Sequence, residues 1–151
     1  MLIRSIAVFS AVLLAAACTP APSTGESGTP APRQDRPEET LVTSLSVQPA
    51  RDTVRLTLQV TNAAAVPVTL AFTSGQAYDF AVERGGETLW RWSADRSFMQ
   101  ALRDETLAPG ETRTYTEAWH PGAATAGEFI ARGWLTSSSH PVERTAAFHL
   151  P

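Results

Sequence analysis

The chain has 151 residues and a net charge of −3, and its 12 basic residues are all arginines dispersed among 15 acids. This length predicts one folded domain, and the absence of a basic stripe argues against a nucleic-acid partner. Because Cys18 is the single cysteine, no intrachain disulfide can form.

Residues 1–18 have the pattern of an export signal. Arg4 precedes a twelve-residue apolar run from Ile6 to Ala17. As a helix this run would be about 18 Å long, whereas the hydrocarbon core of a membrane is roughly 30 Å thick. The run is therefore typical of a signal peptide and too short for a membrane span.

The end of this run, Leu14-Ala-Ala-Ala-Cys18, resembles the lipobox of bacterial lipoproteins. The resemblance implies that Cys18 is the lipid attachment site and becomes the new N-terminus. The pattern departs from the commoner form by having Ala15 where leucine is frequent. Ordinary cleavage after the Ala-x-Ala at residues 15–17 is the alternative.

Residues 19–40 predict a disordered linker, because they contain five prolines and two alanines as the only apolar groups. A flexible coil of this length spans roughly 25 Å. Together with a lipid on Cys18, it predicts an exported domain tethered to the cell envelope. The sequence does not distinguish between the inner and the outer membrane.

From Leu41 onward the hydrophobic pattern changes to a period of two, and no segment has a sustained helical period. In the clearest segment Val54, Leu56, Leu58 and Val60 face one way. Short strands at this spacing predict that residues 41–151 form an all-β sandwich of seven to eight strands. The predicted strands are 41–47, 53–61, 66–72, 78–83, 87–92, 112–119, 128–135 and 141–150.

The connections between these strands differ in length. Ser93 to Glu105 is the longer one, with room for one helical turn, and His120 to Gly127 is a second loop. In Ala108-Pro109-Gly110-Glu111 proline and glycine occupy the two central positions of a type II turn.

The hairpin around Gly85-Gly86 can form in two registers. A two-residue loop places Val82 opposite Leu89 and leaves Trp90 and Trp92 on the face of Asp79. A three-residue loop that starts at Arg84 places Phe80 opposite Trp90 and Tyr78 opposite Trp92, which turns all four aromatics inward. Each buried ring contributes at most roughly 4–6 kcal/mol. We therefore predict the three-residue loop, with Gly86 at positive φ as a bulge and the four rings at the centre of the core.

The same segment resembles the BsuPI family, the intracellular proteinase inhibitor domain, over residues 45–136. The resemblance implies an immunoglobulin-like antiparallel β-sandwich and, by name, inhibition of serine proteinases. It rests on Val60-Thr61-Asn62, Val68-x-Leu70-x-Phe72, Ser74-Gly75-Gln76-x-Tyr78-Asp79-Phe80, Leu89-Trp90-x-Trp92-Ser93, Phe98-x-Gln100, Leu107-x-Pro109-Gly110-Glu111 and Trp119.

Chemistry-bearing residues form no recognisable catalytic or metal-binding pattern. His120, His140 and His149 have no metal-ligand spacing and are interpreted as loop residues. The serines 137–139 beside His140 lack a nucleophile elbow and are interpreted as a polar turn.

The remaining polar and aromatic candidates also favour structural roles. Asp79 is interpreted as an outward carboxylate that bonds a loop, without the second group that acid–base work needs. Trp119 and Trp134 are predicted in the core or at its rim. We therefore predict no enzyme activity, no metal and no cofactor.

The connection after Ser93 is the candidate partner-binding loop, because Arg96, Phe98, Met99 and Arg103 are residue types that interfaces favour. The alternative is that Phe98 and Leu102 cap the end of the sandwich. We predict a proteinase-inhibitor-like binding module whose partner is a serine proteinase or another envelope protein. A structural or assembly lipoprotein without inhibitory activity has the same sequence features.

Overall fold

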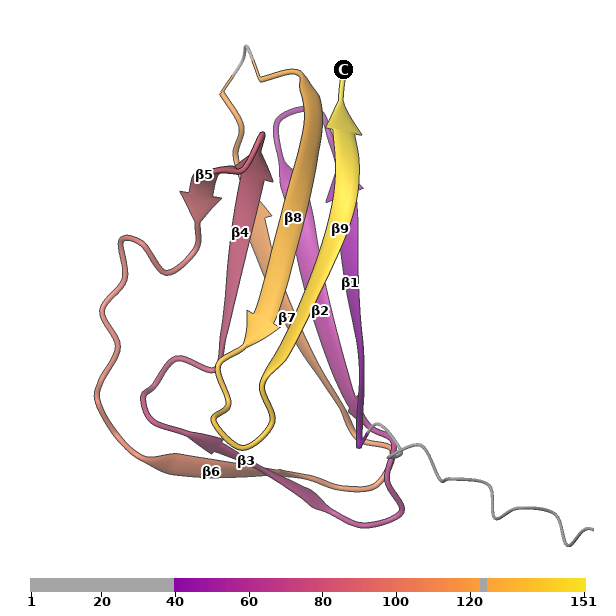
Figure 1. The fold of residues 1–151 in the computed structure, drawn as a ribbon, viewed down its shortest axis with the longest axis vertical. Coiled ribbons are helices and arrows are strands. Elements are labelled where there is room, and N and C mark those ends of the chain that lie inside the picture. Colours follow the sequence, from indigo (N-terminus) through magenta and orange to yellow (C-terminus); the bar gives the residue numbers. More distant parts are fainter. Residues whose placement is uncertain (1–39, 123–124) are drawn as a thin grey trace, which may run out of the picture. The chain divides into compact units, whose positions relative to one another are not determined.

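Alternating side chains build nine strands, all paired antiparallel, in a computed structural model that describes residues 40–122 and 125–151 (Figure 1). No helix occurs in these ranges, and none in the described part of the chain could therefore cross a membrane. The predicted signal peptide (1–18), lipid site Cys18 and linker up to residue 39 lie outside the described residues. The strands are β1 Leu41–Pro49, β2 Val54–Asn62, β3 Val68–Phe72, β4 Tyr78–Arg84, β5 Glu87–Arg91, β6 Arg103–Leu107, β7 Thr112–Trp119, β8 Gly127–Leu135 and β9 Val142–Leu150.

Two sheets face each other and confirm the predicted β-sandwich. One has the strand order β1-β2-β7 and the other β5-β4-β8-β9, and Figure 1 shows β4, β8 and β9 in front of β7, β2 and β1. β3 and β6 form a separate two-stranded ladder that crosses one end of the sandwich (Figure 1).

The core lies between the two sheets and follows the predicted alternation. The four apolar residues of β2 from Val54 to Val60 are fully buried. The sheets approach so closely at Gly133 that a Cβ there would lie 3.0 Å from both Leu45 Cδ1 and Phe80 Cε1. Because real Cβ contacts are seldom this short, a side chain at this position would force these neighbours to move by a few tenths of an ångström.

Buried Asn62 fixes the end of the sandwich where β2, β3 and β6 meet. Its Nδ2 donates to the carbonyls of Val66 (2.9 Å) and Leu107 (3.0 Å), and its Oδ1 accepts from the Ala64 amide (2.9 Å). The adjoining turn has the predicted type II form, because Gly110 has φ +76° and the Glu111 amide donates to the Ala108 carbonyl.

The predicted hairpin loop is wrong. Arg84 pairs with Glu87, so the loop contains two residues, Gly85 and Gly86, with φ of +59° and +86°. Positive φ at both central positions is typical of a type I′ turn, which matches the twist of the flanking strands. Gly86 has the positive φ that we expected, but not as part of a three-residue loop.

A β-bulge then turns the tryptophans inward by a different route. The register shifts between Val82 and Glu83, so that Val82 pairs with Trp90 and Leu89 is the extra residue. The Trp92 amide donates to the Phe80 carbonyl (2.9 Å), in place of the predicted pairing of Phe80 with Trp90.

The expectation that all four aromatics form the centre of the core is also corrected. Phe80 is fully buried, whereas Tyr78, Trp90 and Trp92 are half-buried and pack against the margin of the core. β5 is an edge strand of its sheet, so the rings of Trp90 and Trp92 lie at the margin of the sandwich and not at its centre. Tyr78, on β4, packs there against Trp92.

The strand count differs from the prediction because β6 begins inside the connection that we expected from Ser93 to Glu105. Its residues 103, 105 and 107 alternate inward, but two of these are Arg103 and Glu105. The polar inner face hides the strand period from the sequence.

We predict that Asn62→Ala lowers the free energy of unfolding by about 3 kcal/mol, because it leaves two buried carbonyls and one amide without their partner. Urea unfolding followed by tryptophan fluorescence measures the change. Gln59→Ala, an exposed position of the same strand, is the control and should stay within about 0.5 kcal/mol of wild type. Equal midpoints for the two variants would contradict the role of Asn62.

Candidate protein-contact site

The β5–β6 loop comprises residues 92–102, and its first residues contact the fully buried carboxylate of Asp79 in β4. Ser93 donates to this carboxylate through its hydroxyl (2.6 Å) and its amide (3.1 Å). The Phe80 amide (2.9 Å) and the Arg91 guanidinium (2.8 Å) complete the set of donors. A buried carboxylate is stable only when it is hydrogen-bonded in this way, so Asp79 joins β4 firmly to the start of the loop. Its bond to the loop agrees with the sequence interpretation, although the side chain is buried and not at the surface.

An aromatic stack supports the same end of the loop. The ring of Tyr78 lies between those of Trp92 (4.5 Å between centroids) and Tyr115 (4.6 Å). The Tyr78 hydroxyl donates to Glu117 (2.5 Å). Burial and this hydrogen bond raise the pKa of Tyr78 well above its usual value. The stack joins β4 of one sheet to β7 of the other. Phe98 is partly buried and packs on Trp92, with 5.6 Å between the ring centroids.

The two arginines predicted for partner binding are held within the domain. The guanidinium of Arg96 lies 4.5 Å from the centre of the Trp92 ring, and its Nε donates to the Trp92 carbonyl (3.1 Å). That of Arg103 lies 4.5 Å from the centre of Phe72, and its Nε donates to the Ser74 carbonyl (3.2 Å). Arg103 also forms an ion pair with Glu105. Both side chains therefore brace the loop.

The distal part of the loop projects into solvent. Met99 is 78% exposed and Leu102 is 86% exposed, the two highest values among the exposed large hydrophobic residues of the described chain. The Gly75 amide donates to the Met99 carbonyl (2.8 Å), which fixes the backbone at the start of this segment. Leu102 does not cap the sandwich, contrary to the alternative interpretation of the sequence. The sequence feature that predicts this exposure is the alternation of β6. Residues 103, 105 and 107 face inward, so residue 102 faces outward.

A shallow hollow of about 300 Å³ adjoins the loop between the edge strands β5 and β7. The Nε1 atom of Trp92 is buried and has no hydrogen-bond partner among the described residues. Charges of both signs surround the hollow, and no nucleophile stands beside a base. The lining residues are Trp90, Arg91, Trp92, Asp95, Arg96, Glu117 and Ala118.

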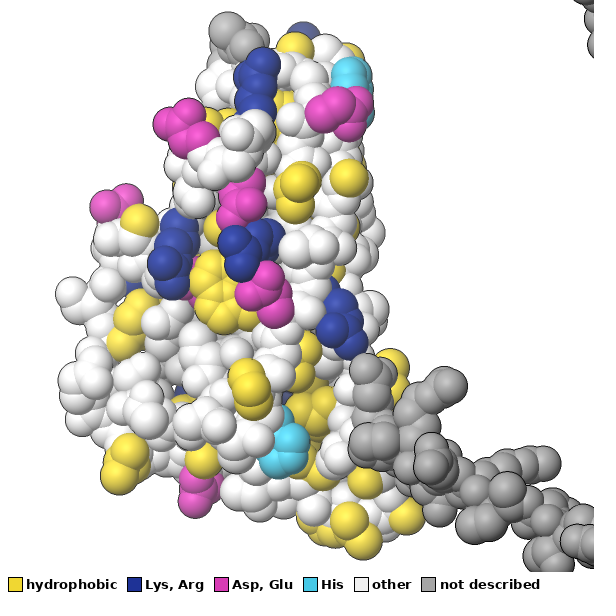
Figure 2. All heavy atoms as spheres, viewed as in Figure 1, with side chains coloured by type: hydrophobic (Ala, Val, Ile, Leu, Met, Phe, Trp, Pro, Cys, Tyr) yellow, Lys and Arg dark blue, Asp and Glu magenta, His cyan; other side chains and the backbone are white. Residues whose placement is uncertain are grey.

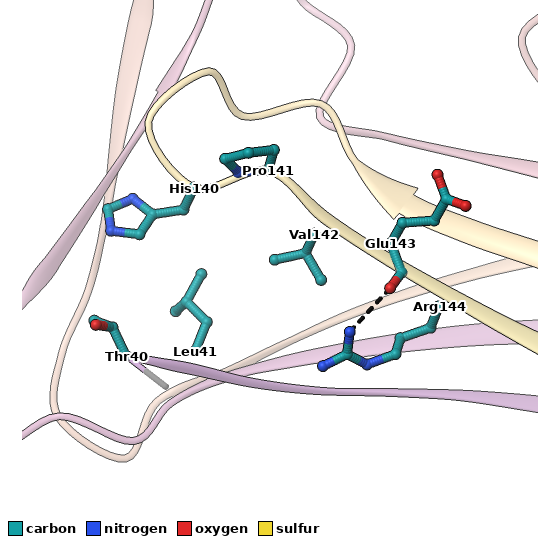
Figure 3. Close-up of a pocket in the computed structure, with 7 residues that line it drawn as sticks. All are labelled: Thr40, Leu41, His140, Pro141, Val142, Glu143 and Arg144. Atoms are coloured by element: carbon teal, nitrogen blue, oxygen red, sulfur yellow. Dashed lines mark hydrogen bonds between the residues drawn. The ribbon is translucent and has the colours of Figure 1, made fainter. Parts of the chain in front are cut away.

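A second hollow of about 290 Å³ lies where β1 and β9 begin (Figure 3). These two are also edge strands, each at the other end of its sheet from β7 and β5. The Arg144 guanidinium donates to the Thr43 carbonyl (3.2 Å) and to the Glu143 carbonyl (2.9 Å), so it joins the two strands. The imidazole of His140 contacts the Ser139 hydroxyl (3.1 Å). The one acid among its lining residues, Glu143, is paired with Arg132 at 2.8 Å.

The serines and the other histidines also have structural positions. Ser137 is buried and donates to the Ala71 carbonyl, and Ser139 donates to the Thr69 carbonyl, so this turn is attached to β3. His120 contacts Thr53 (3.2 Å), and His149 lies in β9 and not in a loop. In residues 40–122 and 125–151, no three His, Cys, Asp or Glu side chains are grouped to hold a metal ion.

The outer face of the β5-β4-β8-β9 sheet carries a charged cluster around Trp134. Arg91 and Arg132 lie over its ring at 5.1 and 5.9 Å, and Arg132 pairs with Glu83 and Glu143, each at 2.8 Å. Figure 2 shows acidic and basic side chains around a hydrophobic patch on this face. Trp134 is half-buried at the surface and Trp119 is in the core.

The residues that carry the family-like pattern are distributed between core and surface. Ser93, together with the rings of Tyr78, Trp90 and Trp92, is partly buried, and the turn residues Pro109 and Gly110 are exposed. The buried members are Asn62, Phe72, Asp79, Phe80 and Trp119.

Comparison with known proteins identifies a family for this domain. The family model described as BsuPI, intracellular proteinase inhibitor, matches residues 41–140. No curated protein matches the chain.

Several solved structures resemble the chain remotely. In each of the following three, 74% of this chain is covered. A β-glucosidase from Kluyveromyces marxianus in complex with glucose has 14% identity and a TM-score of 0.42 over 14% of its length. A penta-heme cytochrome c552 from Thermochromatium tepidum has 14% identity and a TM-score of 0.43 over 40%. The sporulation control protein Spo0M from Bacillus subtilis has 11% identity and a TM-score of 0.42 over 48%. The chain thus spans less than half of each of these proteins.

We predict that Asp79→Asn lowers the free energy of unfolding by about 2–3 kcal/mol, since an amide cannot accept from all four donors. Hydrogen exchange at the Ser93 amide should become faster in Asp79→Ala, because that change removes the oxygen that accepts from this amide. Asp95→Asn removes an exposed acid from the same loop and is the matched control. Unchanged exchange at Ser93 would show that Asp79 does not hold the loop.

Proposed function

This chain belongs to the BsuPI family of intracellular proteinase inhibitors, and we propose that it is a non-catalytic binding module that inhibits a serine proteinase through its β5–β6 loop. The observation that supports this loop is the exposed pair Met99 and Leu102 on a segment held at both ends. The Met99 carbonyl accepts from Gly75, and Arg103 donates to the Ser74 carbonyl.

A rigid projecting loop suits this role for an energetic reason. Ordering a mobile loop on binding costs free energy, and a loop already fixed in its bound form avoids that cost. The anchors at Ser93, Met99 and Arg103 supply such fixation. Exposed apolar side chains on it then supply the contact surface, since a few side chains that become fully buried at the centre of an interface carry most of its binding energy.

We also propose that the domain acts in the cell envelope and not inside the cell. The sequence supports this with its signal-peptide-like residues 1–18, the lipobox-like segment that ends at Cys18, and the proline-rich linker after it. A proteinase encountered there would be an exported or envelope enzyme. The family name refers to an intracellular inhibitor, so the location would distinguish this chain within its family.

Titration of the full chain against a panel of serine proteinases tests the inhibitory function. We expect at least one enzyme to lose its activity stoichiometrically, with the chain intact on a denaturing gel afterwards. Cleavage of the chain without lasting inhibition would identify it as a substrate. No inhibition across the panel would overturn the proposal and favour a structural or assembly module of the envelope.

The anchor is tested by Cys18→Ser in the full chain. Because the lipid would be attached to this sulfur, we expect the protein to move from the membrane fraction to the soluble fraction. Thr19→Ser, a change at the next residue, is the control and should leave the protein with the membrane. Identical fractionation of wild type and Cys18→Ser would contradict lipidation.

A further inference from the structure

We propose that Leu102 is the primary contact residue of this loop, the side chain that enters the specificity pocket of the proteinase. The target is then a serine proteinase whose pocket is apolar and not acidic. This inference rests on the proposed inhibitory function and adds to it the residue and the class of enzyme.

Exposure singles out Leu102 first. At 86% it is the most exposed of the large hydrophobic residues in the described chain. It immediately precedes β6, whose buried residue Leu107 and partly buried residues Arg103 and Glu105 alternate with exposed ones. This alternation directs the side chain of residue 102 away from the core. A side chain in this position can be buried in a partner without disturbing the packing of the domain.

The arginines argue against an acidic pocket. Trypsin-like pockets bind Arg or Lys, whereas chymotrypsin-like pockets bind apolar side chains, and the chain has no lysine. Arg96 is stacked on Trp92 and bonded to its carbonyl. Arg103 is stacked on Phe72 and bonded to Ser74 and Glu105. Entry of either arginine into a pocket would break these contacts, while entry of Leu102 breaks none.

The backbone distinguishes Leu102 from Met99. A serine proteinase binds the carbonyl of the primary contact residue in its oxyanion hole, so that carbonyl has to be accessible. The Met99 carbonyl accepts a hydrogen bond from the Gly75 amide (2.8 Å), whereas the Leu102 carbonyl accepts none from the described residues. Met99 is thus placed to contact the rim of the partner's site, and Leu102 to occupy its pocket.

The residues on both sides hold this segment in place. The bond between Gly75 and Met99 fixes the chain before Leu102, and the bond from Arg103 to Ser74 fixes it directly after. Only Gln100 and Ala101 lie between the first anchor and Leu102. The contact residue is therefore presented on a segment that loses little freedom on binding.

The experiment measures inhibition constants of full-chain variants against two serine proteinases, one with an apolar pocket and one with an acidic pocket. We expect the wild type to inhibit the first enzyme far more strongly. Leu102→Ala should weaken that inhibition by about 30-fold or more, the loss typical of a central contact. Met99→Ala should have a smaller effect. Leu102→Arg should improve inhibition of the second enzyme by about tenfold or more, because its pocket binds Arg.

Val66→Ala is the matched control, because Val66 is an exposed aliphatic residue (64%) near the far end of the β3–β6 ladder. It should leave both inhibition constants unchanged. If the apolar-pocket enzyme is inhibited equally by wild type and Leu102→Ala, or if Met99→Ala weakens inhibition more, the assignment is overturned while the inhibitory function stands. If neither these enzymes nor the wider panel is inhibited, the proposed function itself fails.

Discussion

The carboxylate of Asp79 is the constraint on which the candidate site depends. It is fully buried, and an ion in that position is stable only if its oxygens are all hydrogen-bonded. The side chains of Arg91 and Ser93 and two backbone amides meet that demand. Because the Ser93 amide is one of these donors, the backbone at the start of the β5–β6 loop is fixed relative to β4. The position of the loop is thus set by the electrostatics of one buried group.

The parts of the fold that the sequence predicts correctly are those where the side-chain pattern repeats. In β2 four apolar residues recur at a period of two, and all four are buried. The hairpin at Gly85-Gly86 fails because its sequence fits both loop lengths, and the outcome depends on a bulge at Leu89. The type I′ turn sets one register, and the inward tryptophans need another. The bulge makes both possible, and no local sequence pattern indicates it.

The sequence predicts which loop holds the candidate residues, but not which of their side chains are exposed. Residue type alone pointed to Arg96, Phe98, Met99 and Arg103, and all four lie in or next to the β5–β6 loop. The structure sorts them by their contacts, because both arginines are stacked on rings and Phe98 packs on Trp92. A cap at the end of the sandwich was the alternative role for Leu102, and its exposure excludes that role. Its exposure follows from the alternation of β6, which the inward Arg103 and Glu105 conceal.

The loop is attached to two separate parts of the domain, and this explains how an exposed segment can be rigid. Its start is bonded to β4 through Asp79, and its end is bonded through Arg103 to Ser74, the second residue after β3. Movement of the loop as a whole would therefore require either the buried carboxylate or the β3–β6 ladder to give up its contacts. A proteinase bound at Leu102, as we propose, would meet a segment whose ends cannot separate easily. Such a segment behaves as an inhibitor when its fixed ends favour the intact chain over the cleaved one, which is a property of the fold and not of the loop sequence alone.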